Sequence, residues 1–145
     1  MKVINSKDFD RFLDVARSKA TPQRLFLVFA EKEYAREEEM FDGAVAAAGG
    51  FAIKPLMYID KPLAKLTDFN DLLKESLENG KPWDLLYVSA SEDPGLTEDF
   101  INQRLELMVK MIHQGITDKL LIFNQSGDMS KLAKLGVQPR VKLDS

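Results

Sequence analysis

The chain contains no cysteine and only one histidine, and these absences remove whole classes of chemistry. Without cysteine in its 145 residues, it cannot form disulfides, thiolate nucleophiles or cysteine-type zinc sites. No Gly-x-Ser-x-Gly elbow offers a nucleophile to the single histidine, His113. The signatures of a phosphate loop and of a dinucleotide fingerprint are also missing. Motifs alone therefore predict no catalytic residue, no metal ligand and no cofactor.

Positive charge and long apolar runs are also scarce. The formal net charge is −3, which gives no electrostatic attraction to a phosphate backbone and argues against a nucleic-acid partner. No apolar stretch reaches the roughly 18 residues of a membrane span, and the first six residues lack the apolar region of a signal peptide. We therefore expect a cytoplasmic protein with no membrane partner.

Four apolar runs at 25–30, 56–59, 85–88 and 120–123 are the strongest structural signal in the chain. The gaps between them are long enough for helices, which is typical of an α/β fold. The first run is apolar almost throughout, as in a strand covered on both faces. We predict a single α/β domain over 1–145, with residues 136–145 as a tail. Its sheet is expected to be mixed and mostly parallel, with four to five strands, about four flanking helices and a C-terminal β-hairpin.

Apolar periodicity and end signals place the individual elements. Proline cannot donate to a strand ladder, so Pro55 is expected at an edge or at the first position of a strand. The Ser-Gly pair within 124–128 indicates a hairpin turn. Apolar residues spaced three and four positions apart predict the helices, and short apolar runs predict the strands. The predicted helices are 7–18, 33–48, 67–80 and 97–115, and the predicted strands are 24–30, 56–59, 84–90, 119–123 and 129–132.

Polar residues follow several of the predicted strands and mark a candidate site. In an open parallel sheet, ligands bind beyond the carboxyl ends of the strands. If the strands are parallel and adjacent, three carboxylates converge on one rim and could hold Mg²⁺ together with a neighbouring lysine. The alternative is that these polar residues only lead the chain into solvent. The candidate rim residues are Glu31, Asp60, Lys61, Ser91 and Asp93.

Patterns over residues 9–132 resemble a small family of uncharacterised proteobacterial proteins, often labelled "ribonucleotide reductase subunit alpha". The matching segments are 22–30, 58–61, 69 with 72–76, 83–84 with 88–90, and the closing hairpin. The resemblance implies a bacterial cytoplasmic setting and brings no catalytic residues with it. The chemistry in the label needs a thiyl radical and a redox cysteine pair, whereas this chain has no cysteine.

Two classes of function remain open on the sequence. The first is a protein-interaction or ligand-binding module that acts as a homodimer or as the partner of another protein and uses an exposed sheet edge. The second is a small-molecule or Mg²⁺-dependent enzyme at the rim, which requires the rim side chains to converge in a pocket.

Overall fold

A four-stranded antiparallel sheet forms the centre of the computed structural model, which describes residues 7–34, 51–80 and 82–130. The strands are ordered β2-β1-β3-β4 across the sheet, and every neighbouring pair is antiparallel. Their bounds are β1 Gln23–Tyr34, β2 Phe51–Pro62, β3 Leu85–Glu92 and β4 Leu121–Asn124. The helices of the described part are α1 Asp8–Arg17, α3 Phe69–Asn79, α4 Glu98–Gln114 and the short 3-10 helix η3 Leu63–Lys65.

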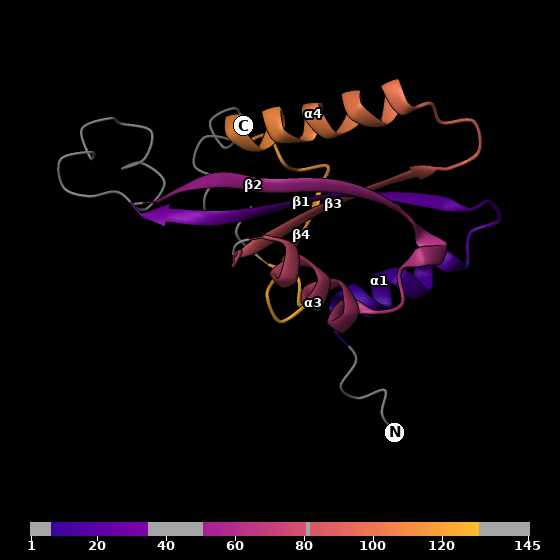
Figure 1. Cartoon of the computed structure of the whole chain (residues 1–145), viewed down its shortest axis with the longest axis horizontal. Coiled ribbons are helices and arrows are strands. Elements are labelled where there is room, and N and C mark those ends of the chain that lie inside the picture. The colour runs from indigo at the N-terminus through magenta and orange to yellow at the C-terminus, as the bar shows by residue number, and fades with distance from the viewer. Residues whose placement is uncertain (1–6, 35–50, 81, 131–145) are drawn as a thin grey trace, which may run out of the picture.

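The helices cover both faces of the sheet and make three layers. In Figure 1, α4 lies on one side of the strands, and α1 and α3 lie on the other. Alternate residues of β1 supply the two cores, because successive side chains of a strand point to opposite faces. Leu25, Leu27 and Phe29 belong to the core under α1 and α3. Phe26 and Val28 belong to the core under α4.

The mostly parallel sheet that the sequence predicted is wrong. The structure shows four antiparallel strands. The prediction relied on the gaps between the apolar runs, which are long enough for crossover helices, and on the apolar run in β1, whose residues 25–30 are indeed completely buried. A central antiparallel strand produces the same run when helices cover both faces, so the pattern reports burial and not strand direction. The expectation of a strand covered on both faces is thereby confirmed.

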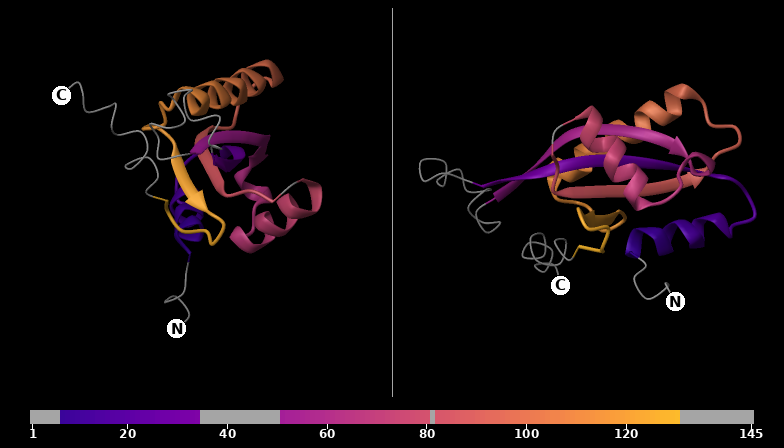
Figure 2. Two further views of the ribbon diagram at one scale, coloured as in Figure 1. Left: turned by 90° about the vertical axis from the view of Figure 1, so that its left-hand side faces the viewer. Right: turned by 60° about the horizontal axis from the view of Figure 1, so that its bottom comes forward.

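The order of the strands decides which strand ends meet. Both β2 and β3 are antiparallel to β1 and lie on either side of it. Their carboxyl ends therefore lie beside the amino end of β1. The carboxyl end of β1 lies at the opposite end of the sheet, where residues 31–34 pair only with β2. Figure 2 shows this two-stranded arm extending past the other strands.

Most predicted element positions are confirmed, but three strands are longer than predicted. Strand β2 covers Phe51–Pro62, whereas a strand over 56–59 was predicted. Strand β1 continues through Glu33 and Tyr34, which were predicted to begin a helix; residues 35–48 of that prediction lie outside the described residues. Strand β3 includes Ser91 and Glu92, which were predicted to form a loop. The predicted turn is confirmed by a bridge between Phe123 and Met129. Residues 131–132 of the predicted return strand and the tail at 136–145 also lie outside the described part.

Of the two positions predicted for Pro55, the structure shows the edge position, since β2 is an edge strand and begins at Phe51, four residues before Pro55. Pro55 lies opposite Ala30, beside an irregularity in the register. The carbonyl of Ala30 accepts from the backbone N–H of Asp84, on the side away from β2. The nitrogen of Pro55 therefore faces the free edge, and no ladder bond is lost.

Side-chain caps fix the starts of the two longer helices. Thr97 accepts a hydrogen bond from the backbone N–H of Phe100 at 3.1 Å and begins α4. Asp68 accepts from Asp71 N at 2.9 Å and begins α3. Such caps stabilise a helix by about 1 kcal/mol. None of the helices in the described ranges has the length and apolar character needed to cross a membrane.

The core under α4 contains a tyrosine hydroxyl that has no partner among the described residues. Tyr87 is only 2% exposed and packs among the apolar residues of this core. Its hydroxyl forms no hydrogen bond with any residue in the described part of the chain. Burial raises the pKa of Tyr87 above its ordinary value, because the phenolate would lose its hydration.

We expect Tyr87 to make the fold sensitive to alkaline pH. The raised pKa means that the unfolded chain loses this proton first. The contribution of Tyr87 is therefore intact below about pH 10 and falls above it, by up to about 1.4 kcal/mol per pH unit. Tyr87→Phe should be neutral or stabilising at pH 7, since it removes an unpartnered hydroxyl. It should also flatten the alkaline decline in urea unfolding. Tyr58→Phe, at a site 50% exposed, is the matched control, and equal curves for both variants would contradict the assignment.

Candidate functional site

An arginine joins two carboxylates at the end of the sheet where β2 and β3 finish. Arg24 lies in the second position of β1, opposite Ser91 of β3. Its Nη1 contacts Asp60 Oδ2 of β2 at 2.5 Å, and its Nε contacts Asp93 Oδ1 after β3 at 2.9 Å. Each of these three side chains is between one fifth and one third exposed. This Arg24 cluster ties three segments distant in sequence to one end of the sheet.

The charges of the Arg24 cluster do not cancel, since one guanidinium faces two carboxylates. The hydrogen bond to Asp93 is the largest cause of a raised pKa at Arg24, and the bond and charge of Asp60 add to it. Arg24 therefore stays positively charged, and the cluster keeps a formal charge of −1. Its partial exposure means that the surrounding water screens part of each ion-pair energy.

The structure brings together only part of the predicted rim. Asp60, Lys61, Ser91 and Asp93 all lie at the end of the sheet marked by Arg24. Lys61 points to the opposite face from Asp60 and pairs with Glu75 of α3 at 3.2 Å. Glu31 lies at the far end of β1, opposite Lys54. The expectation that three carboxylates converge is wrong, because it required parallel strands.

The oxygens that the rim offers are partly occupied by Arg24. Asp60 and Asp93 each give one carboxylate oxygen to its guanidinium. Within residues 7–34, 51–80 and 82–130, no three side chains of the metal-ligating types are grouped so that they could hold an ion. A Mg²⁺ ion at this end would have to compete with the arginine for the same two carboxylates.

A cavity adjoins the Arg24 cluster through Asp93. Its volume is about 420 Å³, within the range of about 300–1,000 Å³ that is usual for ligand sites. The end of α1, the start of β1, the end of β2 with η3, and the segment after β3 form its walls. We call it the α1–η3 cavity. Its lining residues are Ala16, Arg17, Lys19, Ala20, Thr21, Pro22, Gln23, Pro62, Leu63, Ala64, Leu66 and Asp93.

A buried amide lines the α1–η3 cavity. Gln23 is 7% exposed and has the same strand parity as Leu25 and Leu27, which face α1 and α3. Its Nε2 donates to the carbonyl oxygen of Thr21 at 3.1 Å. No group from the described residues donates to its Oε1. A buried acceptor without a partner is unfavourable by about 1–3 kcal/mol, so it is expected to meet water or a ligand.

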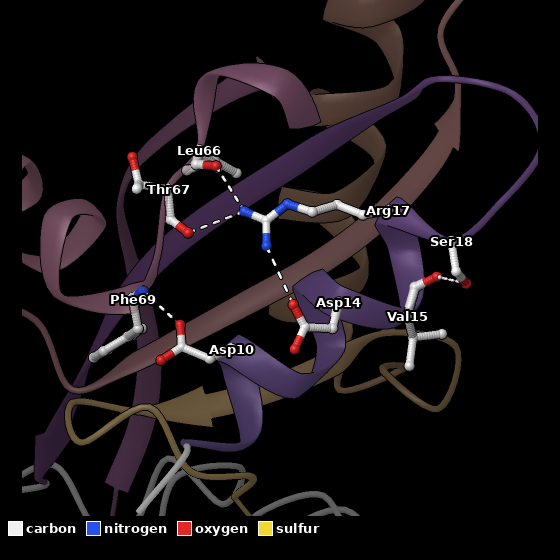
Figure 3. A network of polar contacts seen from close by, with 8 residues as sticks. All are labelled: Asp10, Asp14, Val15, Arg17, Ser18, Leu66, Thr67 and Phe69. Atoms are coloured by element: carbon white, nitrogen blue, oxygen red, sulfur yellow. Dashed lines mark hydrogen bonds and ion pairs between the residues drawn. The ribbon is translucent and has the colours of Figure 1, made fainter. Parts of the chain in front are cut away.

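Polar contacts between α1 and the segment before α3 hold one wall of the α1–η3 cavity in place (Figure 3). Arg17 Nη2 donates to the carbonyl oxygens of Leu66 at 2.8 Å and Thr67 at 2.9 Å. Asp10, two turns earlier in α1, accepts from the first backbone N–H of α3 at Phe69, at 2.7 Å. These contacts therefore fix α1 to the chain around the start of α3, both near the start of α1 and at its end.

The sequence interpretation did not single out three residues of this region, namely Arg17, Gln23 and Arg24. Gln23 carried a usable signal, because it is a polar residue at an inward position of an otherwise apolar strand. Arg24 was placed in a strand, but a parallel sheet would have put it at the edge opposite Asp60. Arg17 gave no sequence signal, since its partners are backbone carbonyls about 50 residues away.

The sequence of this chain was compared with family models and with curated proteins, and its structure with solved structures. The resemblance suggested by the sequence patterns remains a prediction. Because no family model, curated protein or solved structure matches the chain, the site is interpreted from its own geometry.

Proposed function

We propose that this domain binds a small organic molecule in the α1–η3 cavity. The observation that carries the proposal is the side chain of Gln23, whose buried Oε1 has no donor from the described part of the chain. Most of the cavity wall is apolar, with a few polar groups at fixed positions. Apolar walls with a small number of placed polar groups are the usual composition of ligand pockets.

The surface supports a ligand better than it supports a protein partner. The free edge of β2 carries Pro55 and Pro62, which have no backbone donor for an added strand. The large exposed apolar side chains of the described part come from α1, β2, α3, α4 and the segments after α4 and β4, and these helices lie on both sides of the sheet. They are Val15, Tyr58, Leu77, Phe100, Leu107, Ile116 and Met129. Single exposed apolar residues are ordinary on soluble proteins.

The proposal extends to the setting of the protein. A bacterial cytoplasmic location is supported by the sequence resemblance and by the absence of cysteine. A homodimer or a protein partner remains a second prediction, and Arg24 holding both nearby carboxylates argues against the Mg²⁺-dependent enzyme.

Two substitutions at the α1–η3 cavity test the proposal. Ala64 lines the cavity from η3 and is exposed, so Ala64→Trp should fill the opening without unfolding the domain. Lys65 is the next residue, is exposed and is not part of the lining, so Lys65→Trp is the matched control. A library of small polar compounds is screened by amide NMR shifts of the labelled protein. We expect hits that shift residues of the cavity and disappear in Ala64→Trp alone.

Gln23→Met separates a role in binding from a role in folding. Methionine has a similar length and no hydrogen-bonding amide. The free energy of unfolding should therefore fall by less than about 1 kcal/mol, or rise. Affinity for a library hit should fall at least about tenfold, which corresponds to 1.4 kcal/mol. A screen without hits, or hits that bind both Gln23→Met and Ala64→Trp as tightly as the natural chain, would refute the proposal.

A further inference from the structure

We infer that the ligand of the α1–η3 cavity is a small zwitterion of the amino-acid type, an inference that rests on the function proposed above. Its ammonium group would bind Asp93 and Gln23 Oε1, and its carboxylate would bind Lys19. The three residues belong to different walls of one cavity. Each has a charge or lone pair that no described residue binds and that this ligand would satisfy.

The Arg24 cluster makes one wall of the cavity attractive to a cation. Asp93 uses Oδ1 to bind Arg24, and its Oδ2 forms no ion pair or hydrogen bond within the described ranges. Its side chain is 24% exposed, so it is accessible from the cavity and only partly screened by water. Because the cluster has a formal charge of −1, a cation beside Asp93 would neutralise it.

Gln23 favours an ammonium group over a hydroxyl as the ligand's donor. An ammonium group has three N–H donors and no acceptor. It therefore has enough donors for both acceptors that line the cavity, the charged oxygen of Asp93 and the neutral Oε1 of Gln23. A hydroxyl donates only once and brings no charge. The two acceptors together thus favour a primary amine.

The segment between α1 and β1 supplies the complementary positive charge. Lys19 lines the cavity, and its Nζ forms no ion pair with any residue that the structure describes. Arg17 is a fixed part of the wall, because its Nη2 is held by Leu66 and Thr67 and its Nη1 lies 3.4 Å from Asp14. A ligand carboxylate would therefore pair with the free lysine. The remaining walls offer apolar surface to a side chain, from Ala16, Ala20, Pro22, Pro62, Leu63 and Leu66.

Matched analogues of one amino acid test this inference by calorimetry on the full chain. The probes are L-leucine, 3-methylbutylamine, which lacks its carboxylate, and 4-methylpentanoate, which lacks its ammonium group. L-alanine tests whether the apolar side chain contributes. We expect L-leucine to bind at least about tenfold more tightly than either singly charged analogue, which is the effect of one lost charged contact of 1.4 kcal/mol.

Variants assign each charge to its residue. Asp93→Asn keeps a bond to Arg24 and should reduce L-leucine affinity to that of 4-methylpentanoate. Lys19→Met should reduce it to that of 3-methylbutylamine, while Lys65→Met, outside the cavity, should leave it unchanged. If the amine or the acid binds as tightly as L-leucine, or if neither Asp93→Asn nor Lys19→Met changes binding, the inference fails and the proposed function stands. If the amino acids and the compound library all fail to bind, both are wrong.

Discussion

Replacing Trp83 with alanine is expected to lower the free energy of unfolding by about 3–5 kcal/mol, the usual loss for a buried aromatic side chain. Trp83 is 1% exposed and precedes β3. Its ring meets Phe29 of β1 at a centroid distance of 5.2 Å and Phe69 of α3 at 6.4 Å, both edge-to-face. Its removal would leave a void between the sheet and α3 that these rigid rings cannot fill.

The polar part of Trp83 can be tested separately. Its indole Nε1 donates to the Ser76 hydroxyl at 2.8 Å, and that hydroxyl donates to the carbonyl oxygen of Leu73 at 2.8 Å. Ser76→Ala keeps the ring and leaves the indole N–H unpartnered, which should be unfavourable by about 1–3 kcal/mol. Urea unfolding followed by circular dichroism measures both variants, since Trp83 is the only tryptophan in the chain. A loss below about 1 kcal/mol in Trp83→Ala would mean that the ring does not fill this core.

Sequence patterns predicted the elements of this fold better than their directions. The amphipathic faces of α1, α3 and α4 and the apolar run in β1 reflect burial, which is a property of each segment alone. Strand direction depends on which segments become neighbours, and no local pattern in β1 records that it lies between β2 and β3. The gap between the apolar runs at 25–30 and 56–59 was also misleading, because it suggested a crossover helix. Strand β1 extends into this gap as far as Tyr34, and β2 begins within it at Phe51.

The same error in direction explains what was found and missed at the candidate site. Asp60 and Asp93 were expected to be close, and they do share Arg24, because β2 and β3 run in the same direction although they are not neighbours. Glu31 was expected beside them, but β1 runs in the opposite direction. The α1–η3 cavity involves the carbonyls before α3 and the end of α1, whose meeting depends on packing between layers. Only Gln23 could have been suspected from strand parity.

Gly127→Ala is expected to destabilise the domain by about 2–5 kcal/mol, combining backbone strain with overlap in a packed core. Gly127 has φ of +83°, a region that side chains disfavour. A Cβ there would lie 2.9 Å from Phe69 Cδ2 and 2.9 Å from Lys7 Cδ. The lysine chain can move, whereas the Phe69 ring is completely buried. The carbonyl of Gly127 also accepts from Phe9 N at 2.8 Å, so a shifted turn would lose its contact with the start of α1.

Gly95 provides the control that separates the two causes. It has φ of +88°, and a Cβ there would meet no atom within 4 Å. Gly95→Ala should therefore show only the backbone strain, about 1–2 kcal/mol. Gly127→Ala should exceed it by about 1–3 kcal/mol in urea unfolding, which is the contribution of the overlap. Phe69→Leu, combined with Gly127→Ala, should recover part of that excess, because residues in contact are energetically coupled. Equal losses at the two glycines would mean that the turn after β4 does not pack against Phe69, and the docking of this turn on α1 and α3 would have to be abandoned.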